Sequence, residues 1–343
     1  MEKVFLTGAT GFVGAYLAHY LLKKGYSIKA LHRPHSAFHL VADIQNKIEW
    51  VEGDITDPYF LEEAMKDCTL VYHAAALVSY NSADNEQMLK INAEGTANMI
   101  NAALHVGIRK FLYVSSIAAL GRKEFVSIFD ENSVWENNKL NTGYAISKFK
   151  GECEVWRGIE EGLEAIIINP AVILGAGYWH QGTGNYFTQV QKGMPFYPKG
   201  STAFVDVRDV AKVAIKLMES NLSAERFVLC SENTSYLTLF TKIAEELNAE
   251  VPRWTLPSWS EGLLWRADAI KAKILGNKPL ITPEILQNMQ NSFTYSNEKL
   301  LKAINYTFVP FSKTIADTAV AYMESKRNNT IFGLLPLENI VNI

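Results

Sequence analysis

The sequence is poor in cysteine: its 343 residues include only three, Cys68, Cys153 and Cys230. Their number is odd, they lie far apart, and they lack metal-ligand spacing, so we expect neither a disulfide framework nor a bound metal. This usage is typical of a reducing compartment. We expect all three thiols to be buried.

Long apolar runs and an excess of charge are missing as well. No run approaches the length of a bilayer span, and no positively charged segment followed by an apolar one precedes the first expected strand. Lysine and arginine (33) nearly balance aspartate and glutamate (36), which gives a net charge of −3 at pH 7. This balance provides no reason to expect nucleic acid or an anionic membrane as a partner. We therefore expect a cytoplasmic protein that binds neither.

A glycine-rich turn is present at residues 7–14, with the sequence Thr-Gly-Ala-Thr-Gly-Phe-Val-Gly. It follows an apolar run and opens a helical pattern, so it predicts a strand, a tight turn and a helix start. Glycine here permits unusual backbone angles and close approach of the main chain, while the helix N-terminus offers free N–H groups to a phosphate. Such a turn also serves as a plain strand–helix connection. The residues expected to contact a dinucleotide are Gly8, Gly11, Phe12, Val13 and Gly14.

The second strand, expected at residues 26–31, ends in a basic residue. In NAD-specific enzymes an acid about 20 residues beyond the glycine turn binds the ribose 2′-hydroxyl. Here His32 and then Arg33 occupy that position. A guanidinium matches a 2′-phosphate instead, so the sequence favours NADP over NAD. The alternative is an arginine that is merely solvated at a strand end.

Strands and helices continue to alternate along the chain, which predicts an α/β fold with a doubly wound parallel sheet of the Rossmann type. We expect a dinucleotide-binding domain at 1–173, with 204–230 returning to the sheet and Asp209 capping a helix there. A smaller, mostly helical substrate-binding region would comprise 174–203 and 231–343. Further strands are expected at 48–51, 70–73, 111–114, 165–168 and 227–229, and further helices at 61–66, 88–104, 140–151, 237–247, 263–275 and 315–322.

Three segments allow two interpretations each. The small side chains of Ala74, Ala75 and Ala76 would let a flat ligand lie against the backbone, or would simply pack in the core. The aromatic residues between 175 and 200 would line a substrate pocket or fill a small second core. The apolar tail at 331–343 would pack on the body of the protein or on a partner.

Tyr144 and Lys148 lie four residues apart on an expected helix, so the phenol and the ammonium share one face. A nearby cation favours the phenolate and lowers the pKa of the tyrosine towards the range of a general acid or base. The same spacing also occurs in ordinary surface pairs. Here the pair follows a glycine turn and a strand that ends in two serines, and this order favours a catalytic role over a surface pair.

Together these segments resemble the extended short-chain dehydrogenase/reductase family over nearly the whole chain. Its NAD-dependent epimerase/dehydratase members are similar, and the dihydroflavonol-reductase-like and 3β-hydroxysteroid-dehydrogenase-like branch is the most similar. The resemblance rests on six motifs in order: the turn at 7–14, Asp54-Ile55, 73–76, Ile-Asn-x-x-Gly-Thr at 91–96, Ser115-Ser116 and Tyr-x-x-x-Lys at 144–148. The branch is indicated by 204–211 and 281–284.

The resemblance implies a role for each matching residue. Tyr144 would exchange a proton with the substrate while hydride moves to or from the nicotinamide. Lys148 would tune Tyr144 and hold the ribose, and Ser116 would bind the reacting oxygen. Asn92 would lie near this relay, on a helix that together with the helix of Tyr144 would form a homodimer interface. The remaining cofactor contacts would be Asp54 and Ile55 at the adenine and Pro170 at the nicotinamide.

The leading hypothesis is an NADP-dependent oxidoreductase that reduces a ketone or aldehyde of a small, fairly apolar substrate, or oxidises the alcohol. The alternatives are an NAD-dependent nucleotide-sugar epimerase and a cofactor-sensing protein without activity. Two departures from the sugar-modifying members favour the first. Asn169 stands where many of them have arginine, and Ile117 and Ala118 replace the acid pair that elimination of water requires.

Overall fold

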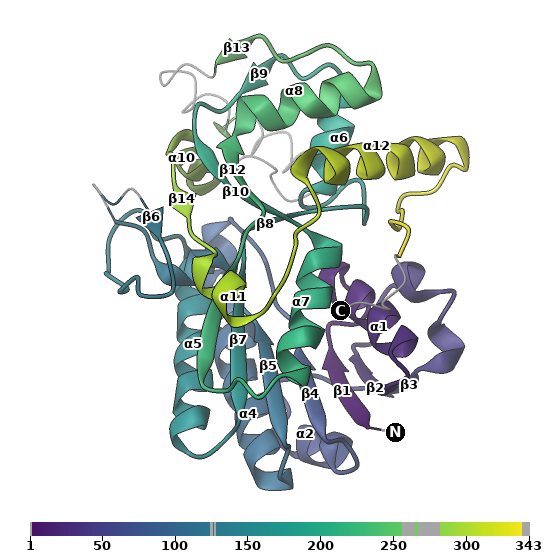
Figure 1. Ribbon diagram of the computed structural model, residues 1–343, viewed down its shortest axis with the longest axis vertical. Coiled ribbons are helices and arrows are strands. Elements are labelled where there is room, and N and C mark those ends of the chain that lie inside the picture. The colour runs from purple at the N-terminus through teal and green to yellow at the C-terminus, as the bar shows by residue number, and fades with distance from the viewer. Residues whose placement is uncertain (1, 124–125, 127, 256–264, 267–281, 338–343) are drawn as a thin grey trace.

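The computed structural model describes residues 2–123, 126, 128–255, 265–266 and 282–337. A seven-stranded sheet, parallel throughout, forms the centre of the larger part (Figure 1). Its strand order is β3-β2-β1-β4-β5-β7-β11. This order confirms the predicted doubly wound Rossmann sheet. The strands are β1 (Lys3–Thr7), β2 (Ser27–His32), β3 (Glu49–Glu52), β4 (Leu70–His73), β5 (Lys110–Val114), β7 (Ala165–Pro170) and β11 (Glu225–Leu229).

Helices cover both faces of this sheet because successive side chains of a buried strand point to opposite faces. In β1, Val4 and Leu6 join the hydrophobic cluster under α1 (Phe12–Lys23) and α7 (Val207–Glu219). Phe5 belongs to the opposite cluster, with residues of α2 (Pro58–Met65), α4 (Gly95–Val106) and α5 (Gly143–Glu160). The sheet therefore has a separate hydrophobic core on each face.

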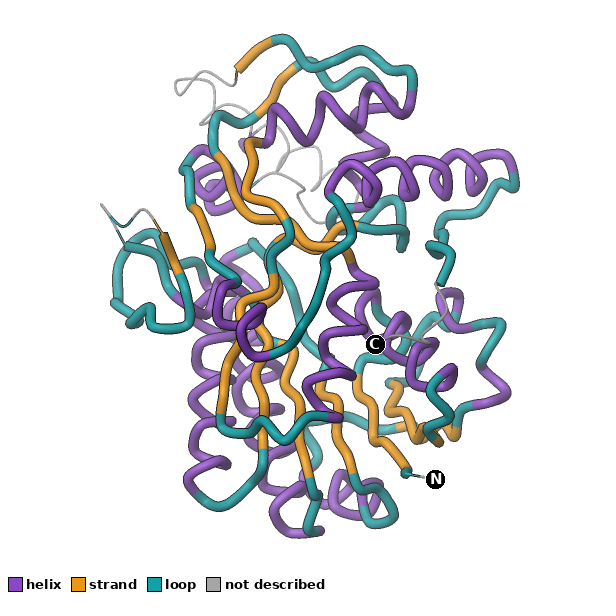
Figure 2. Tube along the Cα trace, viewed as in Figure 1, coloured by secondary structure: helices purple, strands orange, loops and turns teal. Residues whose placement is uncertain are grey.

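A smaller lobe sits at the carboxyl end of the sheet, and it contains strands as well as the expected helices (Figure 2). Its three-stranded sheet has the order β12-β10-β8. Two strand pairs, β13-β9 and β14-β6, complete it. The elements are β6 (Ile128–Phe129), β8 (Val172–Leu174), α6 (Gly184–Gln191), β9 (Phe196–Tyr197), β10 (Ser201–Asp206), β12 (Glu232–Ser235), α8 (Tyr236–Leu247), β13 (Trp254–Thr255), α10 (Pro283–Gln290), β14 (Thr294–Tyr295) and α12 (Phe311–Arg327). Between β14 and α12, α11 (Glu298–Ala303) packs against β11 of the large sheet.

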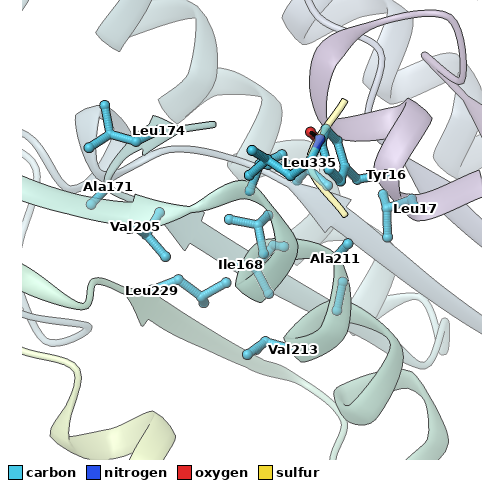
Figure 3. Packing of buried hydrophobic residues seen from close by; sticks show 14 of the residues in the cluster. Tyr16, Leu17, Ile168, Ala171, Leu174, Val205, Ala211, Val213, Leu229 and Leu335 are labelled. Carbon is cyan, nitrogen blue, oxygen red and sulfur yellow. Dashed lines mark hydrogen bonds between the residues drawn. The ribbon is translucent and has the colours of Figure 1, made fainter. Parts of the chain in front are cut away.

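The segment after α12 returns to the larger part and packs against α1 (Figure 3). The buried Leu335 donates its backbone N–H to the Tyr16 hydroxyl at 2.8 Å, and that hydroxyl donates to the carbonyl of Ala176 at 2.9 Å. Through residue 337, therefore, the apolar tail packs on the body of the protein. Within the returning segment 204–230, β11 joins the large sheet and α7 contacts α1, whereas residues 204–206 belong to β10 of the small sheet.

Several sequence-based expectations need correction. Cys153 is exposed, because the buried stripe of α5 passes through Glu152 and Val155 and leaves residue 153 outside it. The expected helix at 88–104 is divided into α3 (Asn85–Leu89), a π-helical turn at Lys90–Glu94 and α4. The helix α6 was not expected. The helix expected at 263–275 lies outside the described residues apart from 265 and 266.

Asp209 does not cap a helix, although its position before an apolar stripe suggested so. The N-cap of α7 is Asp206, whose carboxylate accepts from the backbone N–H of Arg208 at 2.7 Å. Asp209 is buried in the first turn and accepts hydrogen bonds from Tyr306 Oη and Val309 N. Burial raises its pKa to about 6. Of the two acids near the start of α7, the earlier one, Asp206, is therefore the cap.

Candidate active site

The glycine turn forms a cradle that larger side chains would fill. Gly8 has a φ of +75°, and a Cβ there would lie 2.8 Å from the carbonyl carbon of Ala74. A Cβ on Gly14 would lie 2.0 Å from the carbonyl oxygen of Gly8. Gly11 is the N-cap of α1 and offers no side-chain acceptor to the first N–H groups of the helix. These features fit the diphosphate of a dinucleotide, whose oxygens would accept from those groups.

A neutral histidine ties this cradle to the next strand of the sheet. His73 is fully buried, which lowers its pKa to about 3. Its Nδ1 lies 2.7 Å from Thr7 Oγ1, and its Nε2 lies 3.1 Å from Thr96 Oγ1. Thr7 Oγ1 also accepts from Ala75 N at 3.1 Å. This network fixes the alanine run beside the glycine turn. Ala74 and Ala75 are half-buried and pack against the two hydrophobic cores, whereas Ala76 is exposed.

The other residues expected at the cofactor follow strands at the same edge of the sheet. Arg33 follows β2 with an exposed side chain, while its backbone N–H donates to Ser36 Oγ. Asp54 follows β3 and accepts from the N–H and hydroxyl of Thr56 at 2.9 and 2.8 Å. The others lie nearby: Ile55 is buried, Phe12 and Val13 are half-buried in the first turn of α1, and Pro170 is buried at the end of β7.

Ser116 and Tyr144 come together where β5 ends and α5 begins. Ser116 Oγ accepts from Ala118 N at 3.1 Å, and the Ser116 side chain is close enough to the Tyr144 phenol to affect its ionisation. The ring of Tyr80 lies 6.0 Å from that of Tyr144. Burial raises the pKa of Tyr144, whereas Ser116 acts to lower it. The sequence predicted a lowered pKa, and the direction is the opposite because desolvation of the phenolate dominates.

Lys148 is buried one turn further along α5. Its Nζ donates to the carbonyl of Val114 at 2.8 Å and lies 4.1 Å from the centre of the Tyr113 ring. Burial lowers the pKa of Lys148 to about 7, although the Glu152 carboxylate acts to raise it. A lysine with this pKa changes its charge near neutral pH.

Glu152 is the centre of a buried network that the sequence motifs do not include. Its carboxylate accepts from Ser115 Oγ at 2.6 Å, from the Asn169 amide, and from an Arg226 guanidinium nitrogen at 3.3 Å. The Asn169 amide also donates to the carbonyl of Ser116 at 2.9 Å. The network therefore holds the strand end that carries Ser116. A signal for it was available, because Glu152 lies four residues after Lys148 on the same helix face.

Asn92 lies in the π-helical turn and is 1% exposed. Its amide exchanges two hydrogen bonds of 2.8 Å with the backbone of Leu77 and donates to Ser147 Oγ at 2.9 Å. It thus connects the alanine run after β4 with the helix that carries Tyr144 and Lys148. A π-turn of this kind often occurs at functional sites.

Residues of both parts of the molecule complete the surroundings of Tyr144. Burial raises the pKa of Tyr80, while the Arg122 guanidinium acts to lower it and the Glu284 carboxylate to raise it. Burial also raises the pKa of Tyr186 on α6, and Tyr80 acts in the same direction. Other aromatics of 175–200 behave as core, since Trp179 and Phe187 are almost fully buried. Arg122 also lies in this region, because it follows the turn that begins after Ser116. No motif or spacing in the sequence indicated this residue.

Among the described residues, no group of three or more His, Cys, Asp or Glu side chains could hold a metal ion. None of the helices within the described ranges has the length and hydropathy needed to cross a membrane.

Comparison with known proteins shows the same arrangement elsewhere. A protein named "Putative dihydroflavonol 4-reductase" from Synechocystis is 29% identical over 323 residues, 91% of this chain and 92% of the relative. Cinnamoyl-CoA reductase 1 of Petunia hybrida is 27% identical, with 94% and 92% covered. The crystal structure of UDP-glucose 4-epimerase from Thermotoga maritima has the same fold, with a TM-score of 0.77 at 17% identity and 94% and 99% coverage.

Residues 4–230 match the family described as the NAD dependent epimerase/dehydratase family, which binds NAD. The matched part runs from β1 to the residue after β11, so it includes the glycine cradle, the serine pair and the Tyr-x-x-x-Lys helix. Relatives of this chain are named as reductases, and proteins of the same fold as epimerases and dehydratases. The chain is therefore an enzyme that belongs to the NAD dependent epimerase/dehydratase family, within the extended short-chain dehydrogenases/reductases.

Proposed function

We propose that this enzyme is a reductase that uses NADPH to reduce a ketone or aldehyde of a small, largely apolar substrate, or oxidises the corresponding alcohol. The observation that carries the proposal is the placement of three residues at the sheet edge that bears the glycine cradle: Ser116 just after β5, and Tyr144 and the buried Lys148 one turn apart on α5. The two relatives named as reductases support the direction of the chemistry.

In this proposal the carbonyl oxygen accepts hydrogen bonds from Ser116 Oγ and Tyr144 Oη. The pKa of Tyr144 is raised, so the phenol holds its proton at neutral pH and begins the reduction as the acid. Lys148, when protonated, stabilises the phenolate that remains after proton transfer. When bound, the nicotinamide supplies or accepts the hydride. Glu152 and Asn169 position Ser116 without touching the substrate.

The preference for NADPH rests on Arg33. Its side chain is exposed at the carboxyl end of β2 and forms no ion pair within the described chain. It is therefore available to a 2′-phosphate, and a carboxylate that would bind a 2′-hydroxyl is absent from its position. His32, directly before it, adds a second donor at the same strand end.

Elimination of water is disfavoured by the residues after Ser116. Ile117 and Ala118 are buried in the 3₁₀ turn at Ile117–Leu120, so this turn presents no carboxylate to serve as acid or base. A dehydratase mechanism would therefore lack its acid and base at this position.

The test is net oxidation of NADPH with a panel of aldehydes and ketones, followed at the nicotinamide absorbance band. We expect stoichiometric NADPH consumption that Tyr144→Phe abolishes and a protein that purifies largely free of cofactor. A firmly bound NAD that stays oxidised while a nucleotide sugar is interconverted, without change at that band, would instead establish an epimerase.

A further inference from the structure

Arg122 is a cation that the described chain leaves without a counterion. Its Nε is fully buried and has no hydrogen-bond partner, and no described carboxylate lies within ion-pair distance of it. Two other arginines differ: Arg208 pairs with Asp206 and Asp317, and Arg226 pairs with Glu152. The Arg122 side chain is half-buried, and a guanidinium that the protein holds without a counterion can pair with an anionic ligand.

Uncharged groups hold the Arg122 guanidinium in place. One terminal nitrogen donates to Asn288 Oδ1 on α10, and the guanidinium acts to lower the pKa of the Tyr295 hydroxyl, which burial raises. Its face lies over the ring of Phe293, 4.9 Å from the centroid. These contacts orient the fork of donors but do not neutralise it. The site is therefore built to present a positive charge.

This charge lies close to the proposed reaction centre. The backbone N–H of Arg122 donates at 2.9 Å to Oδ1 of Asn141, directly before the N-cap of the helix that carries Tyr144. The ring of Tyr80 is 6.0 Å from that of Tyr144, and burial raises the pKa of Tyr80 while Arg122 acts to lower it and Glu284 to raise it. Glu284 forms no ion pair with Arg122 within the described chain. Arg122 is thus the positive group, and Glu284 the negative one, that act on Tyr80.

We propose that Arg122 binds a carboxylate on the substrate, at the end remote from the reacting carbonyl. The inference rests on the proposed function and narrows its substrate to carbonyl compounds that carry an acid group. A carboxylate matches the planar fork of the guanidinium and would accept from its terminal nitrogens. The aromatic residues Phe293 and Tyr80 suit a flat, apolar body between the two polar ends.

The experiment compares three para-substituted benzaldehydes: para-formylbenzoate, its methyl ester, and the para-trimethylammonio analogue. Binding of each to the whole enzyme, with and without NADP⁺, is measured by calorimetry, and NADPH oxidation is followed in parallel. We expect the carboxylate to bind roughly 10- to 100-fold more tightly than the ester, the scale of a charge-assisted contact. Arg122→Met should remove this preference, and Arg122→Lys should keep part of it.

Lys123→Met is the matched control, since Lys123 is the neighbouring cation and already pairs with Glu136. This variant should bind the three probes as the wild type does, and thermal unfolding should show that the Arg122 variants remain folded. Equal binding of carboxylate and ester, or a preference for the ammonium probe, would overturn the inference. In that case, Tyr144-dependent reduction of the ester would still support the proposed function. Arg122-dependent binding of the carboxylate without any reduction would support the role of Arg122 and contradict the proposed function.

Discussion

The two halves of the candidate site are constructed differently. At the β1 end the site is formed mainly by backbone atoms of a glycine turn, an alanine run and a helix N-terminus. The buried His73 holds them in place through its contact with Thr7. At the β5 end the surfaces are side chains, and Ser116, Tyr144 and Lys148 depend on buried partners such as Glu152. The backbone half is sensitive to any added volume. The side-chain half is sensitive to single polar atoms and to pH.

The largest effect, on turnover, should come from removal of the Tyr144 hydroxyl in the side-chain half. Tyr144→Phe keeps the ring beside Tyr80 but removes the proposed proton donor, so turnover should fall roughly 10²- to 10⁴-fold. NADPH affinity, measured by fluorescence titration, should change little, because the cradle at the other half is untouched. Substantial activity in this variant on a confirmed substrate would mean that another group supplies the proton.

The backbone half is tested by two glycines with nearly the same backbone angle. Gly8 has a φ of +75° and Gly25 a φ of +86°, but a Cβ on Gly25 would meet nothing within 4 Å. Gly25→Ala should therefore cost about 1 kcal/mol, from the left-handed conformation alone. Gly8→Ala should cost a further 1–3 kcal/mol or so from overpacking and should weaken NADPH binding. Urea unfolding and cofactor titration would measure both, and equal losses in the two variants would refute the close approach of Gly8 to Ala74.

The proposed preference for NADPH rests on Arg33, at the backbone half of the site. Arg33→Ala should weaken NADPH binding by about 1–3 kcal/mol and leave NADH binding nearly unchanged. Titration of both cofactors against both proteins gives the answer. A parallel loss for NADH would show that Arg33 does not contact a 2′-phosphate.

The most gradual effect, which extends over several pH units, concerns the charge of Lys148 in the cofactor-free enzyme. Its pKa is about 7 when folded and near 10.5 in an unfolded chain, so the unfolded state binds the extra proton between these values. The free energy of unfolding should therefore rise with pH from about 7 to 10.5, by at most ~1.4 kcal/mol per pH unit. Lys148→Met should lack this contribution. Urea titrations of both proteins at several pH values would measure it, and parallel curves would contradict a lowered pKa.

The same contrast explains what could be predicted from the sequence. Backbone sites depend on residue types at fixed local spacing, so Gly8, Gly11 and Gly14 are enough to locate the cradle. Tyr144 and Lys148 are equally predictable, because helical spacing is also local. Arg122 and Tyr80 were missed because segments distant in sequence bring them together. Asp209 was assigned wrongly since two acids had similar spacing and only tertiary contacts distinguish them.

The hydrogen bond between Tyr16 and Leu335 joins residues 319 positions apart. During synthesis, Tyr16 on α1 leaves the ribosome 319 residues before Leu335, which completes its packing. The first helix of the nucleotide-binding half thus reaches its final environment only after residue 335 has emerged. A nascent chain halted before that residue would leave exposed the apolar side chains of α1 that Leu335 covers, and such surfaces bind chaperones.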